Sequence, residues 1–239
     1  MALSQPSLRR IILWNLLAFQ AGSLNVGGFM ACHKFVSHVT GFSTLFGAEM
    51  ARGHWSTAAQ FLLVPLFFLG GSLISGLLID SRTLEGKEPL YPIVFSILTL
   101  STAIILGLGA SHVFGKFGMT ADMDKDFFLL ALLCFSCGLQ NATVTSAYGA
   151  VVRTTHLTGL TTDLGVSLSK ILNPRLALNQ RKMETRASLM RLGIIGSFTL
   201  GSLICGLIFI KTNYWGFAIP FFISVGLLIF SLALKSKTL

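Results

Sequence analysis

The chain has 239 residues, of which 53% are hydrophobic and only 11% are charged. A soluble domain carries about 25% charged residues, so this composition excludes a soluble protein and indicates an integral membrane protein. The formal net charge of +9 does not indicate nucleic-acid binding, because no folded basic module accompanies the positive residues.

Six long apolar stretches predict transmembrane helices. Each is long enough to cross a hydrocarbon core of about 30 Å at 1.5 Å per residue, and none alternates in polarity as a membrane β-strand does. They cover about residues 11–33, 56–79, 91–113, 127–150, 188–210 and 214–234. The expected fold class is all-α, a polytopic helical membrane protein that forms one membrane domain over residues 1–239.

Two shorter segments, residues 35–51 and 154–170, carry a shared motif. The first contains HVTGFSTLFG and the second contains HLTGLTTDLG. Both segments are at the lower length limit for a membrane span, and both are too polar to face lipid. We expect re-entrant or spanning helices that face protein or water, with Gly41 and Gly159 permitting a break in each helix.

The threonines of the motif allow two interpretations. Thr40 and Thr44 are four residues apart and share a helix face, and the same is true of Thr158 and Thr162. Their hydroxyl groups either hold neighbouring helices together or line a substrate path.

Two acidic residues, Glu49 and Asp163, also lie inside the short segments. An ionisable group costs roughly 2.5 to 3.5 kcal/mol at the centre of a membrane helix, so it needs a partner or a role there. On a continuous helix His38 shares a face with Glu49, and His156 likewise shares a face with Asp163. Each pair could line a polar path. Alternatively, both acids lie at the membrane interface, where Glu49 would pair with Arg52.

Three segments of the first half recur in the same order in the second half. AFQAGSLN is matched by CFSCGLQN, the two short motifs correspond, and GSLISGLLI is matched by GSLICGLIF. We therefore expect two internal repeats, residues 11–113 and residues 127–234. Duplicated halves that meet at a central site are the usual architecture of secondary transporters. In the match, Cys134 and Cys137 replace alanines, which indicates helix packing rather than a redox or metal site.

Positive residues gather around one predicted linker, residues 170–186, and a cytoplasmic loop beside anionic lipid accounts for them. If the short segments are re-entrant, six helices cross and the repeats are inverted; if they span, eight cross and the repeats are parallel. Both topologies place this linker and both termini in the cytoplasm, so the charge distribution does not choose between them. The first span is too long for a secretory signal, and we expect it to be retained.

The Gly-x-x-Asn span followed by FVSHVTG, with Thr-Gly recurring in the second half, resembles the YoaK-like family of bacterial multi-pass membrane proteins of unknown function. The resemblance covers most of the chain in length and segment order, and its specific part is Ser37 to Gly41. The family usually has Asn after this Thr-Gly, where this chain has Phe42. The resemblance implies a bacterial inner-membrane protein and brings no established substrate.

We expect a transporter or permease for a small solute; the contrasting hypothesis is a non-transporting assembly or regulatory protein. In the transporter, the two motif segments face each other near mid-membrane, and Glu49 or Asp163 binds a coupling proton or cation. The candidate binding residues are Asn25, His38, Thr40, Gly41, Thr44, Glu49, Asn141, His156, Thr158, Gly159, Thr162 and Asp163. No catalytic motif occurs in the sequence, so we expect no enzyme, cofactor or metal, and the lipid bilayer and an unknown small solute as partners.

Overall fold

The computed structural model describes residues 8–119, 123–147 and 157–235. Every regular element in these residues is helical, which confirms the all-α fold. The elements are α1 (Leu8–Cys32), α2 (Val39–Ala51), α3 (Trp55–Gly76), η1 (Leu77–Ser81), α4 (Arg82–Leu84), α5 (Tyr91–Ala110), α6 (Met123–Ala147), α7 (Leu157–Leu172), α8 (Leu178–Thr212), η2 (Asn213–Phe217) and α9 (Ala218–Lys235).

Four helical stretches of the described residues are long and apolar enough to cross a membrane. They are Trp55–Leu84, Tyr91–Ala110, Asp126–Thr145 and Leu178–Ala233. The last contains both α8 and α9, joined by the short 3-10 turn η2. Helix α1 is not among the four although it has 25 residues, and it carries Asn15, Gln20 and Asn25 along its length. The chain is therefore a membrane protein with several apolar helices.

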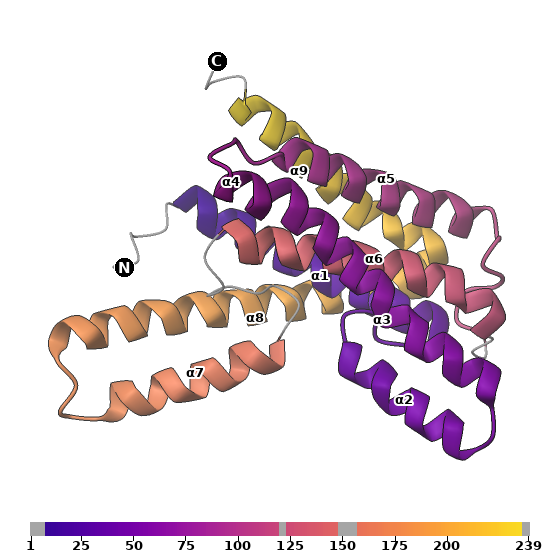
Figure 1. The fold of residues 1–239 in the computed structure, drawn as a ribbon, viewed down its shortest axis with the longest axis horizontal. Coiled ribbons are helices and arrows are strands. Elements are labelled where there is room, and N and C mark those ends of the chain that lie inside the picture. Colours follow the sequence, from indigo (N-terminus) through magenta and orange to yellow (C-terminus); the bar gives the residue numbers. More distant parts are fainter. Residues whose placement is uncertain (1–7, 120–122, 148–156, 236–239) are drawn as a thin grey trace.

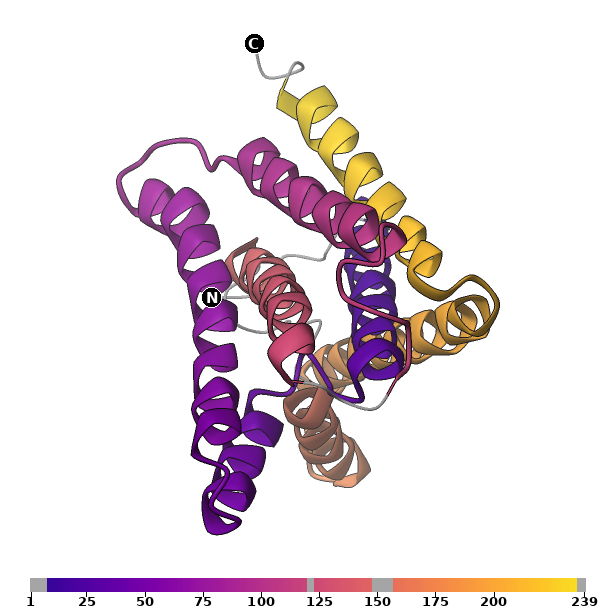
Figure 2. The ribbon, with the colours of Figure 1, turned by 90° about the vertical axis from the view of Figure 1, so that its right-hand side faces the viewer.

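Helices α1 and α6 form the middle of the bundle. Figure 2 shows α6 between α3 and α1, with α8 on the far side of α1, and the packing contacts join the same neighbours. Helices α5 and α9 pack against each other and cover one side of this row. Matching helices of the predicted repeats run in opposite directions, α1 against α6, α3 against α8, and α5 against α9 (Figure 1).

Close contacts of glycine with backbone join α1 to α8. A side chain at Gly22 would collide with the carbonyl group of Phe198, and one at Gly201 would collide with that of Phe19. The Ser202 hydroxyl donates a hydrogen bond to the carbonyl oxygen of Gly22 over 3.2 Å. Small residues permit this approach, and helices in lipid depend on such packing.

Helices α3 and α6 meet in the corresponding way. Side chains at Gly71 and Gly138 would collide with the carbonyl groups of Phe135 and Phe68, respectively. The Ser72 hydroxyl donates to the carbonyl oxygen of Gly138 over 3.1 Å. The sequence comparison aligns Gly71 with Gly201 and Gly138 with Gly22, so both contacts use matching positions. Each predicted half thus packs its helix pair onto the other half rather than onto itself.

The predicted linker over residues 170–186 is largely helical, and the prediction of a polar linker there was wrong. Helix α7 continues to Leu172, and α8 begins at Leu178, about ten residues before the predicted span. The segment is rich in Leu, Gln, Arg, Lys, Met and Glu, all good helix formers. Helices α7 and α8 therefore form a hairpin, which projects from the bundle at the left of Figure 1.

Candidate functional site

The connection between α1 and α2 turns back into the bundle. The Oδ1 atom of buried Asn25 accepts hydrogen bonds from the backbone N–H groups of Val36 and Ser37, each over 3.2 Å, and from the Ser37 hydroxyl over 3.0 Å. The Val36 carbonyl oxygen accepts a hydrogen bond from the Cys134 thiol of α6 over 3.1 Å. Asn25 precedes the end of α1 by two turns, so the chain reverses beside the middle of α6. This use of Asn25 is structural.

The motif helices begin just before their Thr-Gly pairs. Helix α2 begins at Val39 and has 13 residues, so it is only about 20 Å long. Helix α7 begins at Leu157 and has 16 residues. Gly41 and Gly159 both lie within the first turn, and the predicted break of each helix at glycine was wrong. His156 and the residues before it, back to 148, lie outside the described residues.

The motif threonines are exposed. The Thr44 hydroxyl donates to the carbonyl oxygen of Thr40 over 3.1 Å, and the Thr162 hydroxyl donates to that of Thr158 over 3.0 Å. The hydroxyl groups of Thr44 and Thr162 therefore form these hydrogen bonds within their own helices. In the described residues they do not join these helices to a neighbour. His38 is exposed as well, and its ring lies against Phe35 with the ring centroids 5.3 Å apart.

Glu49 forms a charged cluster at the end of α2. Its Oε1 atom lies 2.6 Å from Nη1 of Arg52, and its Oε2 atom lies 2.7 Å from Nδ1 of His54. The hydrogen bond with His54 and the neighbouring guanidinium group of Arg52 lower the pKa of Glu49 below its ordinary value. This geometry agrees with the interfacial alternative for Glu49. Asp163 is exposed on α7, and it has no hydrogen bond or ion pair with another described residue.

The two motif helices pack on different partners. Helix α2 packs on α3 and α7 packs on α8, and the two hairpins point to opposite sides in Figure 1. Asn141 is half-buried in α6, on the bundle rather than on either hairpin. The expected common site formed by both motifs therefore stays a prediction.

A different set of polar side chains gathers where α1, α5, α6 and α9 pack together. The Gln20 amide of α1 donates to the Ser224 hydroxyl of α9 over 2.6 Å and to the Pro220 carbonyl oxygen over 3.0 Å. The Thr102 hydroxyl of α5 lies 3.5 Å from that of Ser224. Beside it, the hydroxyl groups of Ser101 and Ser136 bond α5 to α6. We name Gln20, Ser101, Thr102, Ser136, Gln140 and Ser224 the central polar cluster.

Gln140 completes this cluster from α6. Its amide nitrogen donates to the carbonyl oxygen of Leu17, one turn along α1 from Gln20. Gln20 is 0% exposed and Gln140 is 1% exposed, yet neither Oε1 atom has a hydrogen-bond partner among the described residues. A buried acceptor without a donor costs about 1–3 kcal/mol, so the cluster offers two acceptor atoms to a bound molecule or water.

The central polar cluster was missed by the sequence analysis although its signal was present. Gln20 and Gln140 stand within the two matched strings AFQAGSLN and CFSCGLQN, near the middle of α1 and α6. The prediction of site residues considered ionisable groups, but neutral amides also cost free energy when they are buried in a membrane without hydrogen-bond partners. The serines and threonines give a weaker signal, because such residues occur throughout membrane helices as packing groups.

No curated protein and no solved structure matches this chain. A family model does match, over residues 13–231, and its description is a protein of unknown function, DUF1275. The match runs from within α1 to within α9 and includes both motif hairpins, and it is consistent with the YoaK-like resemblance seen in the sequence. The chain therefore belongs to the DUF1275 family, whose function is not known.

Proposed function

We propose that this protein transports a small uncharged solute across the bacterial inner membrane and binds it at the central polar cluster. The observation that carries the proposal is the pair of buried Oε1 atoms of Gln20 and Gln140, which have no hydrogen-bond donor. Both face the packed centre of the bundle, where water does not replace the missing donors freely.

The repeat architecture supports this proposal. The reciprocal packing of α1 on α8 and of α3 on α6 uses matching glycines and matching serines. Matching helices run in opposite directions (Figure 1). These features support two inverted repeats, and transporters with inverted repeats bind solute between the halves near the middle of the membrane. We infer that the central polar cluster lies at that place, because α1 and α6 belong to different predicted halves.

The solute class follows from the chemistry of the cluster. Its members are amides and hydroxyl groups, and none carries a charge. The two free positions are acceptors, so the solute should offer N–H or O–H donors, as polyols and small amides do. Glu49 and Asp163 lie on the motif hairpins, away from this cluster, and the proposal gives them no part in coupling.

A ligand screen followed by an uptake assay tests the proposal. The purified full-length protein in detergent is heated with a panel of polyols, small amides and nucleosides, and its melting temperature is recorded. We expect at least one of these solutes to raise the melting temperature and to enter proteoliposomes that contain the protein. The double variant Gln20→Leu/Gln140→Leu should lose both effects, with about tenfold weaker binding for each hydrogen bond removed.

Ser96→Ala is the matched control for this experiment, because Ser96 is exposed on α5 and its hydroxyl bonds only to the Pro92 carbonyl oxygen of its own helix. This variant should bind and transport as the wild type does. If the double Leu variant keeps both solute stabilisation and uptake, the proposed site is wrong. If no solute stabilises the wild type and the double variant is less stable than it, the buried amides serve only packing, as a non-transporting membrane protein requires.

A further inference from the structure

The hairpin of α7 and α8 carries a basic tip that no other described element matches. The turn between the helices covers residues 173–177. Arg175, Lys182 and Arg186 are exposed there, and their side chains form no hydrogen bond or ion pair with another described residue. Arg181 differs, because its Nη2 atom donates to the Asn173 carbonyl oxygen over 3.0 Å.

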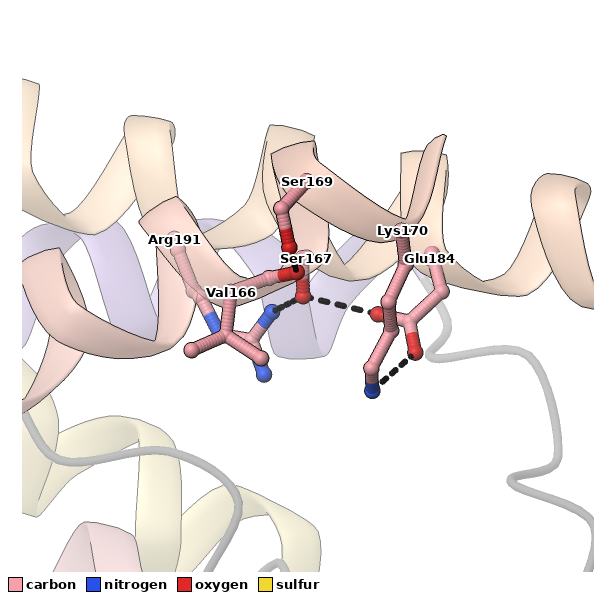
Figure 3. Close-up of polar contacts among 6 residues, drawn as sticks. All are labelled: Val166, Ser167, Ser169, Lys170, Glu184 and Arg191. Carbon is pink, nitrogen blue, oxygen red and sulfur yellow. Dashed lines mark hydrogen bonds and ion pairs between the residues drawn. The ribbon is translucent and has the colours of Figure 1, made fainter. Parts of the chain in front are cut away.

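A polar network holds the two helices of the hairpin together behind this tip. Figure 3 shows Ser167 between Arg191 and Glu184, with Lys170 on the other carboxylate oxygen of Glu184. The Ser167 hydroxyl donates to Oε2 of Glu184 over 2.7 Å, and Nη1 of Arg191 donates to the Ser167 oxygen over 2.7 Å. Nζ of Lys170 lies 2.9 Å from Oε1 of Glu184. The charge of Lys170 is paired within this network. The charges of Arg175, Lys182 and Arg186 at the tip are not part of it.

Apolar side chains are exposed along the same hairpin. Farther from the turn they are Val166 and Leu168 on α7 and Leu189 and Leu192 on α8; nearer to it they are Leu172, Leu178 and Met183. Toward its tip, the hairpin thus changes from an apolar zone to a zone with both apolar and basic side chains. A lipid leaflet changes in the same order, from acyl chains to headgroups. Basic side chains at the second level attract anionic headgroups.

The matching hairpin of α2 and α3 has different chemistry at its tip. Arg52 is its positive residue there, and that charge is paired with Glu49. His54 bonds to the same carboxylate. An unpaired basic tip is therefore found on one hairpin and a charge-compensated tip on the other. The difference between two otherwise matching elements indicates that the positive charge serves a partner of the α7–α8 hairpin and not the hairpin fold.

We propose that the tip of the α7–α8 hairpin, through Arg175, Lys182 and Arg186, binds the phosphate groups of anionic lipids in the leaflet that it reaches. Leu172, Leu178 and Met183 enter the boundary between headgroups and acyl chains beside these contacts. The interaction anchors α7, which the polar network behind the tip joins to α8.

Lipid-dependent stability of the full-length protein in detergent tests this proposal. Phosphatidylglycerol, phosphatidylcholine or inorganic phosphate is added, and the melting temperature is recorded at low and high salt. We expect phosphatidylglycerol to raise the melting temperature more than phosphatidylcholine does, with an excess that falls at high salt. Inorganic phosphate should give no comparable shift, since it lacks the acyl chains.

The variant Arg175→Gln/Lys182→Gln/Arg186→Gln should lose the excess shift, because each basic residue contributes about fivefold to affinity for an anionic surface. Lys182→Arg should retain it, and Arg52→Gln on the other hairpin should retain it as a matched control. Equal shifts with the two lipids would overturn the proposal, as would an unchanged excess in the triple variant. A shift of equal size with inorganic phosphate would show a free anion site instead of a lipid contact.

Discussion

At the scale of single residues, hydrogen bonding explains what several motif positions do. Asn25, one of the expected binding residues, receives three hydrogen bonds that hold the turn before α2. The motif hydroxyls of Thr44 and Thr162 bond within their own helices. Polar groups in an apolar chain need partners, but the sequence does not reveal whether the partner of a side-chain amide is a solute or a turn eleven residues later.

Removal of the Asn25 amide should destabilise the protein. Asn25→Leu keeps the side-chain volume but leaves the buried N–H groups of Val36 and Ser37 without an acceptor, at about 1–3 kcal/mol each. We expect a clearly lower melting temperature in detergent. Ser37→Ala is the control, because it removes one hydroxyl donor and keeps both backbone contacts, so its effect should be smaller. Equal effects of the two variants would mean that Asn25 does not hold the turn.

The cluster around Glu49 predicts a pH dependence. The folded protein holds the pKa of Glu49 below its ordinary value, chiefly through the hydrogen bond with His54. A lowered folded pKa stabilises the protein above the unfolded pKa, and this contribution is lost as the pH falls through the folded value. The difference in melting temperature between Glu49→Gln and the wild type should therefore become smaller as the pH is lowered below the ordinary carboxylate pKa.

At pH 7 the same variant should melt slightly below the wild type, since an exposed ion pair contributes little. The measurement is a series of melting curves for both proteins between neutral and acidic pH. A difference that grows on acidification would contradict the assignment of the Glu49 contacts.

At the scale of elements, apolar length predicted most long helices, whereas the basic segment before α8 was misjudged. A polar segment indicates chain outside the bilayer, but it does not indicate that the helix has ended. The residues from Leu178 onward favour helix as strongly as those within the predicted span. The glycine contacts belong to this scale too. Matching glycines were visible in the repeat, but their partners lie on distant helices that no local pattern identifies.

Substitutions of two glycines on α8 should separate packing from helix propensity. Gly201→Ala forces a methyl group against the backbone of Phe19, and we expect a loss of about 1–3 kcal/mol in stability. Gly196→Ala on the same helix meets no atom within 4 Å, so it should be neutral or stabilising because alanine favours helix. Melting temperatures of both variants in detergent compare them. A neutral Gly201→Ala would contradict the close packing of α1 on α8.

At the scale of the whole molecule, the sequence left six and eight crossings open because charge alone fits both. The structure adds the turn held by Asn25, the short α2 and the opposite directions of matching helices. We infer from these features that the motif hairpins are re-entrant and that the halves are inverted. In the proposed orientation both termini face the cytoplasm, as the basic tip of the α7–α8 hairpin requires.

The two topologies predict different labelling of the hairpin tips. With six crossings Gly53, in the turn before α3, faces the periplasm, whereas Pro174, in the turn before α8, faces the cytoplasm. With eight crossings both tips face the cytoplasm. The four native cysteines are buried, so replacing them with alanine gives a background in which Gly53→Cys and Pro174→Cys are labelled one at a time with a membrane-impermeant maleimide on intact cells.

We expect Gly53→Cys to react on intact cells and Pro174→Cys to react only after the membrane is opened. Glu85→Cys provides an internal check, since the loop before α5 is cytoplasmic with six crossings and periplasmic with eight. Protection of Gly53→Cys together with reaction of Glu85→Cys on intact cells would establish eight crossings. Parallel halves would then follow, and the proposed solute site between inverted repeats would lose its architectural support while the buried amides of Gln20 and Gln140 would still need donors.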